Sequence, residues 1–560
     1  MEYEYPHKIE SLFDEATETW SDIYAAKNLK GQVVQIAIPR EEQEPEQIAK
    51  AFLRKGVSLP SKDVRRGPIA AAAQVQAPIA HRAARAGWHP DGRAFVSFLH
   101  VSRSSRQKHV IRPPEAALTG GASELRIQGD LKGWQSFARL AKHSSAMFAT
   151  LSAVFAAPLL TLVKRPPFAL ILVGPSRCGK SSAQLLAGSA MGFSREEQLP
   201  NMNATSAGLQ AMAVAFNDHA LLINEVGTAA GSKKSVYDTL RNTTYALSNG
   251  QDITRHPTWL GASTLGGATY SSIQVFSSEI SPDEWAARNN DSRDPGEQAR
   301  LISLPVLLNG QDSIFDLPPG DKTGEELKQW CKEQFGTIRQ NVAEHRGTAF
   351  TTYTDYLISN RKQCVKAARG HVRRFERKFD ATGRSAIERD IIGKFAVLYA
   401  GAVIAIEAEV LPYKPKRALS LIITACTAAL GSVPDPKARL SENVKKLKRF
   451  LESPSIIDAD ACSKKQMKLI SQSDGFYTKS EDITRYTVRA ELFTGIFKTA
   501  LDVRTVLEWL HSEGFLETTK QPDARKSNSW AQSQARWPDR SRPRSIVLQL
   551  PRGLVSLDII

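Results

Sequence analysis

The most constraining feature of the sequence is the segment Gly174-Pro-Ser-Arg-Cys-Gly-Lys180-Ser181, which matches the pattern G-x-x-x-x-G-K-[ST]. The residues before it, 168–173, form a continuous apolar run typical of a buried strand. Residues 180–191 have the pattern of an amphipathic helix. A strand, a glycine-rich turn and a helix in this order predict a phosphate-binding loop within an α/β fold.

The residue types explain how such a loop holds a nucleotide. Glycines let backbone N–H groups wrap around phosphates, Lys180 offers a compact positive charge, and the Ser181 hydroxyl can ligate Mg²⁺. The helix N-terminus adds its own partial positive charge. We therefore expect ATP and Mg²⁺ as ligands, with contacts from Gly174, Pro175, Ser176, Arg177, Cys178, Gly179, Lys180, Ser181 and Ser182. Cys178 is either a small packing residue or a redox-sensitive thiol.

A second strand, Leu221-Leu222-Ile223, ends in Asn224-Glu225. A P-loop ATPase needs one acidic residue near Mg²⁺ and a second to activate the attacking water. Glu225 is the expected base. Asn224 is expected at the metal, where its amide can hydrogen-bond a magnesium-bound water but brings no negative charge. This substitution leaves ATP binding intact and puts the rate of hydrolysis in doubt.

Two further positions complete the predicted catalytic set of Lys180, Glu225, Ser278 and Arg300. An apolar strand at 272–276 runs into Ser277-Ser278-Glu279, and Ser278 is either a γ-phosphate sensor or a strand cap. Arg300 precedes another apolar strand at 301–307. Its rigid guanidinium suits an arginine finger that reaches the nucleotide of a neighbouring subunit. The alternative is a surface salt bridge.

These motifs, in this order, resemble the AAA+ family of domain of unknown function nine-two-seven, whose members include replicative helicases of mobile elements related to the MCM group. The resemblance covers about residues 50–420 and includes Gly87-Trp88-His89, Trp134 and Lys394-Phe395-Ala396. It implies nucleotide contacts at Gly174, Gly179, Lys180, Ser181 and Ser182, a catalytic Glu225 and a finger at Arg300. Asn224 stands where Asp is usual and Lys394 where Arg is common.

Strands alternating with helices predict an α/β class with a parallel sheet. We expect an α+β N-terminal domain (1–130), a P-loop AAA+ core (131–320), a helical lid (321–433) and a basic C-terminal domain resembling a winged helix (434–560). Residues 1–32 are expected to form helix and linker, 33–38, 93–101 and 124–129 strands, and 281–298 a surface loop.

The charge distribution indicates a polyanionic partner. The chain has 74 Lys and Arg against 58 Asp and Glu, a net charge of +16. Residues 361–560 hold 36 of these basic and 22 of these acidic residues, a net of +14. We therefore expect DNA to bind the C-terminal half. We expect a cytoplasmic protein, because its five cysteines are scattered and its N-terminus is polar. The apolar run at 146–163 suits a buried helix better than a membrane span.

Three basic segments are candidates for the DNA contact. Lys366, Arg369, Arg373 and Arg377 share one helical face, which is either a phosphate-binding stripe or a solvated face. Residues 445–449 are interpreted in the same way. Residues 520–544 interleave basic residues with Trp530 and Trp537, which suits base stacking or a structural wing. By family analogy, basic residues at 233–234 and 254–256 face a central pore.

Two hypotheses follow. The first is an ATP-dependent DNA translocase or helicase of mobile-element or plasmid replication, which works as a homo-oligomeric ring, with six subunits expected. The second is a nucleotide-switched DNA-binding or assembly ATPase that does not unwind, and Asn224 favours it. A small-molecule P-loop kinase is disfavoured because such an enzyme needs no extended basic surface.

Overall fold

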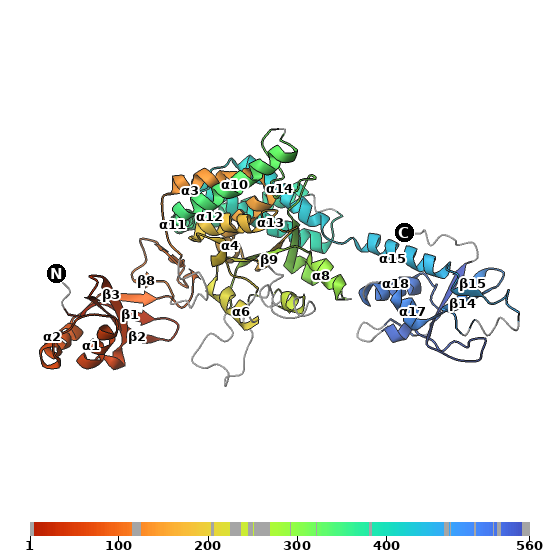
Figure 1. Cartoon of the computed structure of the whole chain (residues 1–560), viewed down its shortest axis with the longest axis horizontal. Coiled ribbons are helices and arrows are strands. Elements are labelled where there is room, and N and C mark those ends of the chain that lie inside the picture. Colours follow the sequence, from red (N-terminus) through yellow and green to blue (C-terminus); the bar gives the residue numbers. More distant parts are fainter. Residues whose placement is uncertain are drawn as a thin grey trace. The chain divides into compact units, whose positions relative to one another are not determined.

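The computed structural model describes residues 5–114, 125–202, 206–224, 237–242, 244, 250, 269–289, 291, 293–320, 322–379, 383–463, 470, 472–497, 500–518, 520–522 and 528–551. The chain forms two compact units (Figure 1). The first comprises residues 1–279 and 295–430, and the second comprises 280–294 and 431–560. The boundaries of the four expected domains stay a prediction.

The first unit begins with a mixed sheet whose strands lie in the order β3-β2-β1-β4-β8. Two helices pack on it, and Ile48, Phe52 and Ile69 from these helices share a core with Tyr24 and Ile38 from the strands. The elements are β1 (His7–Asp14), β2 (Thr19–Lys27), β3 (Val33–Pro39), α1 (Pro45–Arg54), α2 (Lys62–Gln74), β4 (Ile79–Arg82) and β8 (Val110–Arg112).

The prediction of helix and linker for residues 1–32 is wrong, because β1 and β2 form an antiparallel pair there. The charged residues that obscured the strand pattern have partners on other strands of the same sheet. Lys8 lies 3.0 Å from Asp22, and Arg112 lies 2.8 Å from Glu10. Such pairing comes from distant segments and leaves no local periodicity. The strand predicted at 33–38 is confirmed as β3.

A smaller antiparallel sheet contains β5 (Gly87–Trp88), β6 (Ala94–Val96) and β7 (Val101–Arg103). Its residue Trp88 contacts two segments of the first unit that lie later in the sequence. The Trp88 indole N–H donates to the carbonyl of Pro158 at 2.8 Å, and the Trp88 backbone N–H donates to Asp218 at 3.1 Å. The strand expected at 93–101 is therefore interrupted by a turn between β6 and β7. The strand expected at 124–129 is absent from the described residues 125–129, where only an isolated bridge joins Gln128 to Arg346.

The core of the first unit is a parallel sheet in the order β10-β11-β9-β12. Its strands are β9 (Phe168–Val173), β10 (Ala220–Ile223), β11 (Ile273–Ser278) and β12 (Leu301–Pro305). All four were expected from the sequence, as was the α/β class. The order matters for the site, because β11 lies between β9 and β10 and brings its own C-terminal end to the same sheet edge.

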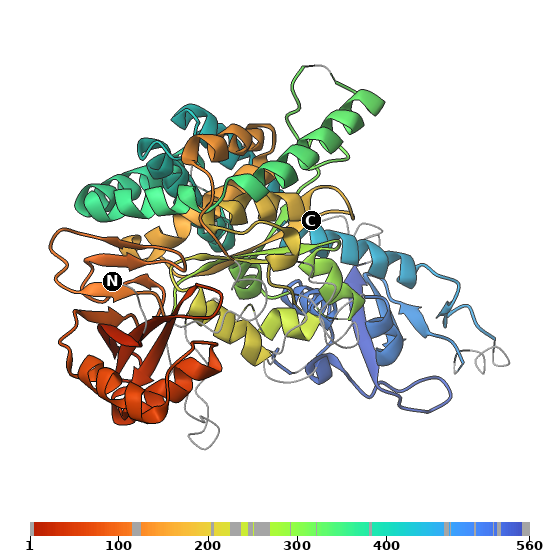
Figure 2. The ribbon, with the colours of Figure 1, turned by 60° about the vertical axis from the view of Figure 1, so that its left-hand side comes forward.

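Helices surround this sheet (Figure 2). The helix α4 (Ser145–Val163) packs against β10, β11, α5 (Lys180–Met191) and α13 (Ala386–Glu407). An 18-residue window of α4 is apolar enough to cross a membrane, yet 89% of that window is buried inside the fold. The helices of the first unit are α3 (Leu131–Ala138), α4 (Ser145–Val163), α5 (Lys180–Met191), α6 (Ser206–Ala215), α9 (Pro295–Arg300), α10 (Gly324–Glu344), α11 (Thr348–Ser359), α12 (Arg361–Glu376), α13 (Ala386–Glu407) and α14 (Pro415–Gly431).

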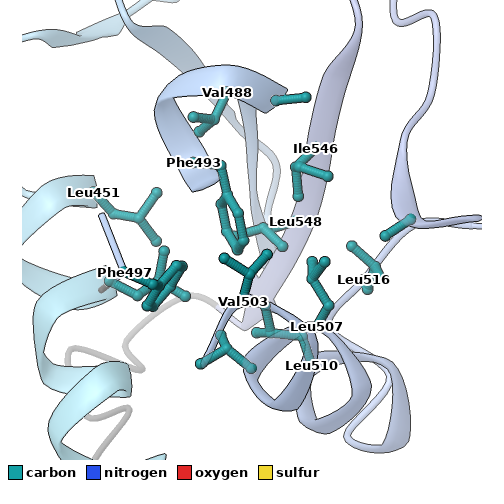
Figure 3. Packing of buried hydrophobic residues seen from close by; sticks show 14 of the residues in the cluster. Leu451, Val488, Phe493, Phe497, Val503, Leu507, Leu510, Leu516, Ile546 and Leu548 are labelled. Atoms are coloured by element: carbon teal, nitrogen blue, oxygen red, sulfur yellow. The ribbon is translucent and has the colours of Figure 1, made fainter. Parts of the chain in front are cut away.

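The second unit combines helices with a sheet in the order β13-β14-β15-β16. Its core joins Phe493 and Leu507 from the helices to Val488, Ile546 and Leu548 from the strands (Figure 3). The elements are α8 (Pro282–Arg288), α15 (Pro436–Leu451), β13 (Ile456–Asp458), β14 (Gly475–Lys479), β15 (Ile483–Arg489), α17 (Ala490–Gly495), α18 (Ala500–Ser512) and β16 (Ser545–Pro551). A winged helix in this unit stays a prediction.

The expectation of a surface loop at 281–298 is wrong, because this segment contains α8 and most of α9. Ser281 is the N-cap of α8, since its hydroxyl accepts a hydrogen bond from the backbone N–H of Glu284 at 3.1 Å. Pro282 occupies the first helical position, where a missing N–H costs nothing. The Ser-Pro pair was therefore a helix-start signal in a segment otherwise rich in loop residues.

Candidate functional site: a phosphate loop at the edge of a parallel sheet

The phosphate loop connects the end of β9 to the start of α5. A side chain at Gly174 would lie 2.6 Å from Val306, and one at Gly179 would lie 2.6 Å from Phe335. Gly179 also has φ of +109°, a backbone conformation that L-residues with side chains rarely adopt. Both glycines are therefore required by close packing, and Gly179 also by its backbone. Pro175, Ser176 and Arg177 are exposed along the loop.

Lys180 opens α5 and folds back over the loop. Its Nζ donates to the carbonyl oxygens of Gly174 at 2.6 Å and Pro175 at 2.7 Å. No side chain caps the start of α5, whose N-cap is Gly179. Backbone N–H groups at a helix N-terminus attract anions. The loop therefore places a positive charge close to a helix N-terminus.

Cys178 is buried inside the loop, and its Sγ lies 3.8 Å from Lys180 Nζ. Burial raises the pKa of the Cys178 thiol, and the neighbouring Lys180 charge offsets this only in part. A thiol with a raised pKa is a poor nucleophile and oxidises slowly. These observations favour the role of a small packing residue over that of a redox sensor.

Asn224 follows β10 and lies beside the loop, as the sequence predicts. Its Oδ1 accepts hydrogen bonds from the Ser181 hydroxyl at 3.2 Å and the Ser277 hydroxyl at 2.9 Å. Ser277 belongs to β11, the strand between β9 and β10. Three oxygen-bearing side chains from three elements thus meet at one point. Oxygen atoms are the donors that Mg²⁺ prefers.

Gln184 connects the same elements one helical turn after Lys180. Its amide Nε2 donates to the carbonyl of Ile223 at 2.9 Å and to that of Val275 at 2.8 Å. The side chain is completely buried. One amide thereby ties α5 to the C-terminal ends of β10 and β11, which carry Asn224 and Ser277. Neither Gln184 nor Ser277 was predicted from the sequence to belong to the site.

Ser278 lies at the end of β11, opposite Val173. Its carbonyl oxygen accepts a hydrogen bond from the backbone N–H of Gly174 at 3.2 Å, so it touches the first residue of the loop. Glu225 falls outside the described residues, as do the basic residues at 233–234 and 254–256. The sensor role of Ser278 and the base role of Glu225 stay predictions.

Arg300 lies at the other end of the sheet from the phosphate loop. It immediately precedes β12, in which Leu301 pairs with Ala169 and Pro305 pairs with Val173. In a parallel sheet this register separates Arg300 from the loop of its own chain by the length of a five-residue strand, about 15 Å. A contact between Arg300 and a nucleotide in the same chain's loop is therefore excluded by distance.

Lys394 of α13 supports the segment that carries Arg300. Its Nζ donates to the carbonyl oxygen of Ala299 and lies 2.7 Å from Asp390. Burial lowers the pKa of Lys394, the Asp390 carboxylate opposes this effect, and the Arg300 charge adds to it. Lys394 is therefore a buried lysine that holds the segment next to the proposed finger.

The basic stripe on α12 is exposed, as the sequence predicts. Cys364, Ala368 and Phe375 face the interior on the opposite side of the helix. The exposed stripe residues are Lys366, Arg369, Arg373 and Arg377. A solvent-facing row of cations separated by one helical turn can contact phosphates without any rearrangement.

The proposal that Trp530 and Trp537 stack on bases is wrong. Trp530 is 5% exposed and belongs to the core of the second unit, and Trp537 is 1% exposed and packs on Phe476. Aromatic residues interleaved with basic ones suggested stacking, but here the aromatic rings point inward and the basic residues outward. Among the described residues of this segment, the exposed basic ones are Lys520, Arg536, Arg540, Arg542 and Arg544.

The residues of the loop fit a magnesium nucleotide. The start of α5 has no side-chain cap, and the Lys180 ammonium beside it adds a positive charge. Ser181 and Asn224 place oxygen atoms beside this terminus. Both features, a concave cradle of N–H donors and a cluster of oxygen ligands, suit the phosphates and the cation of such a ligand.

A protein family described as Domain of unknown function (DUF927) matches residues 6–257. This segment includes the front sheets, the phosphate loop and Asn224, but less than half of the chain. The resemblance inferred over residues 50–420 is supported up to residue 257, and a relationship to the MCM group stays a prediction. No curated protein matches the sequence.

Among solved structures, one described as "SCCmec type IV Cch - active helicase" is similar over 98% of this chain and 94% of its own. The two chains are 15% identical and superpose with a TM-score of 0.60. A likeness at this level of identity establishes a shared fold, and the shared fold spans nearly the entire length of both chains.

Proposed function

We propose that the protein is an ATP-dependent DNA translocase or helicase of the AAA+ class. The observation that carries the proposal is the convergence of Lys180, Ser181 and Asn224 at one edge of a parallel sheet. The fold shared with a protein described as an active helicase supports the choice of a motor over other P-loop proteins. The proposed setting is the cytoplasm and the replication of a mobile element or plasmid.

The proposed chemistry assigns a role to each side chain at this edge. Lys180 leaves its carbonyl partners and neutralises charge on the β- and γ-phosphates. Ser181 and Asn224 hold Mg²⁺, which would neutralise charge on the phosphate oxygens. Glu225 accepts the proton of the attacking water. Ser278 senses the γ-phosphate, and Ser277 keeps Asn224 oriented through its hydrogen bond.

The ring form of the proposal depends on Arg300. Because Arg300 lies a strand length from the phosphate loop of its own chain, it can act as a finger only on the nucleotide of a neighbouring subunit. Active sites that need residues from two subunits make hydrolysis dependent on assembly. We therefore propose a homo-oligomeric ring, with six subunits as the expected number.

DNA is the proposed partner of the exposed stripe on α12 and of the exposed arginines at 536–544. Contacts of this kind go to the phosphate backbone, so binding should weaken as the salt concentration rises.

The proposal is tested by measuring steady-state ATP turnover with and without single-stranded DNA, and strand displacement on forked DNA of each polarity. We expect DNA to stimulate turnover in the wild-type protein. Lys180→Ala should abolish nucleotide binding and turnover, whereas Lys142→Ala, which removes an exposed lysine outside the loop, should leave both unchanged. Turnover that persists in Lys180→Ala would contradict the assignment of the site.

A second candidate is a nucleotide-switched DNA-binding or assembly ATPase that does not unwind. Asn224 favours it, because a neutral amide next to Ser181 brings no negative charge to the metal. Tight ATP binding with negligible turnover, in the presence of DNA, would support the switch and contradict the motor.

A further inference from the structure

Four aromatic rings form a continuous row across the five-stranded sheet β3-β2-β1-β4-β8, which we call the front sheet. Phe13 on β1 lies directly opposite Trp20 on β2 and His81 on β4. The ring centroids are 5.1 Å apart for Phe13 and Trp20, and 5.5 Å apart for Phe13 and His81. His109, at the start of β8, lies 4.5 Å from His81. We refer to Trp20, Phe13, His81 and His109 as the ring row.

The ring row remains partly accessible, although helices cover another part of the same face. Trp20 lies on the face of β2 that also carries Tyr24 and Ala26, because side chains alternate along a strand. Tyr24 and Ala26 are completely buried in the core shared with α1 and α2. Trp20 and Phe13 are only half-buried, and His109 is exposed.

A cation stands at each end of the ring row. At the Trp20 end, the Arg40 guanidinium lies 5.0 Å from the centre of the indole ring, and Asp22 at 3.6 Å helps to hold it there. The Arg40 side chain is 52% exposed. At the other end, His109 belongs to the connection from β7 to β8, where Arg106 and Lys108 are exposed.

The His109 end of the ring row lies in a basic segment, residues 81–112, which is not evident from the net charge of the whole chain. Residues 81–112 contain seven Lys and Arg but only one acidic residue, Asp91. Residues 1–80, with 12 acidic and 10 basic residues, offset this excess only in part, and residues 1–360 together carry a net charge of only +2. The positive charge of this segment nevertheless lies next to the exposed ring of His109.

We propose that the ring row and its flanking cations form a binding surface for single-stranded DNA. Bases of a single strand are free to stack on aromatic rings, whereas those of a duplex are not. Arg40, Arg106 and Lys108 would contact the phosphates on either side. The inference rests on the proposed function for its class of ligand, and it adds a second DNA surface on the front of the chain.

The test uses the full-length protein without nucleotide, so that defects in ATP hydrolysis do not enter. Binding of a fluorescein-labelled oligo-dT is followed by anisotropy at several salt concentrations. Trp20→Ala and His109→Ala should each weaken binding by roughly 5- to 100-fold, the range for loss of one base–aromatic stack. Trp20→Phe and His109→Phe should restore most of it, which a purely structural role of either position would not predict for both.

Matched controls separate the ring row from general loss of surface. Leu29→Ala removes an exposed apolar side chain of the turn between β2 and β3, and Lys50→Ala removes an exposed cation of α1. Both should bind like the wild type. An Arg106→Ala/Lys108→Ala double variant should bind more weakly and show a smaller salt dependence. Blunt-ended duplex DNA should bind Trp20→Ala and wild-type protein equally.

Photo-crosslinking with oligo-dT that carries 5-iododeoxyuridine locates the strand. Cross-links to peptides that contain Trp20 or His109 support the proposal. Cross-links confined to α12 and the second unit, together with unchanged affinity of Trp20→Ala, would overturn it while leaving the proposed motor intact. Unchanged oligo-dT affinity in every ring variant, with binding of a peptide or protein ligand to the row, would overturn it in favour of a protein-docking surface.

Discussion

The hydroxyl oxygen of Ser181 lies 3.2 Å from the amide oxygen of Asn224. This contact joins the start of α5 to the end of β10 without any negative charge. An aspartate at position 224 would have nearly the same shape and could accept the same hydrogen bonds from Ser181 and Ser277. It would add a negative charge and replace the amide N–H donors with a second acceptor oxygen.

Asn224→Asp should therefore fold normally and bind Mg²⁺ more tightly. A carboxylate attracts the cation more strongly than an amide does, because ionised acceptors form stronger interactions than neutral ones. We expect the Mg²⁺ concentration that supports half-maximal binding of a fluorescent ATP analogue to fall by about tenfold, which corresponds to roughly 1.4 kcal/mol. ATP turnover should rise as well.

The matched control is Asn360→Asp, which adds the same charge at the N-cap of α12, outside the site. It should leave the Mg²⁺ dependence unchanged. An identical Mg²⁺ dependence in Asn224→Asp and wild type would show that Asn224 does not face the cation.

Gln184→Leu should destabilise the first unit and misplace Asn224. The substitution removes the donor that the carbonyls of Ile223 and Val275 share. Loss of a buried hydrogen-bond partner costs about 1–3 kcal/mol per group left unsatisfied. Urea unfolding should therefore show a loss on the order of 2–4 kcal/mol. Gln329→Leu, on the exposed part of α10, should be nearly neutral, and equal stabilities of the two variants would contradict the bridging role.

Local motifs carried most of what the sequence revealed about the site. The phosphate loop was predictable because its glycines, lysine and serine are contiguous and are flanked by an apolar strand and a helix. Gln184 and Ser277 were not predictable in the same way. Their roles depend on β11 lying between β9 and β10, and this strand order is a property of the whole sheet.

Side-chain direction explains the errors elsewhere. The strands β1 and β2 were missed because Lys8 and Asp22, which form an ion pair between the two strands, look like scattered charges in the local sequence. Trp530 and Trp537 were misassigned because a basic and aromatic composition does not reveal which residues point inward. The composition of a segment therefore does not show which of its side chains can contact a ligand. A clear hydrophobic periodicity is needed to tell the buried face from the exposed one.

Stability at acidic pH should depend on His219, which is completely buried among aromatic rings, with Phe98 at 4.8 Å. Burial lowers the pKa of His219 to about 4, against the weaker raising effect of its hydrogen bond to the Asn217 carbonyl. In the unfolded chain the imidazole titrates near about 6.5. Between pH 4 and about pH 6.5, the His219 imidazole is protonated in the unfolded chain but stays neutral in the folded protein. Acidification from pH 6.5 towards pH 4 therefore destabilises the folded protein.

His219→Phe keeps the aromatic packing and removes the titration. The free energy of unfolding of this variant minus that of the wild type should increase by on the order of 3 kcal/mol as the pH falls from 7 to 4. The adjacent Asp218, whose pKa burial raises to about 6, contributes in the opposite direction but is present in both proteins. Chemical denaturation across this pH range gives the difference. His109→Phe, at an exposed position, is the control, and a difference for His219→Phe that does not vary with pH would contradict the buried neutral imidazole.

Mixing two inactive variants tests whether Arg300 acts between subunits. Arg300→Ala should still bind ATP but lose turnover, and Lys180→Ala should lose both. In a ring assembled from equal amounts of the two, an interface is intact when an Arg300→Ala subunit supplies Lys180 and a Lys180→Ala subunit supplies Arg300. Random assembly makes about a quarter of the interfaces intact, so turnover should recover towards that fraction of the wild-type value.

The control is Arg389→Ala, which removes an exposed arginine of α13 and should keep full activity alone. A mixture no more active than either variant, under conditions in which both variants assemble, would exclude a finger in trans, and the strand-length separation of Arg300 from its own loop already excludes one in cis.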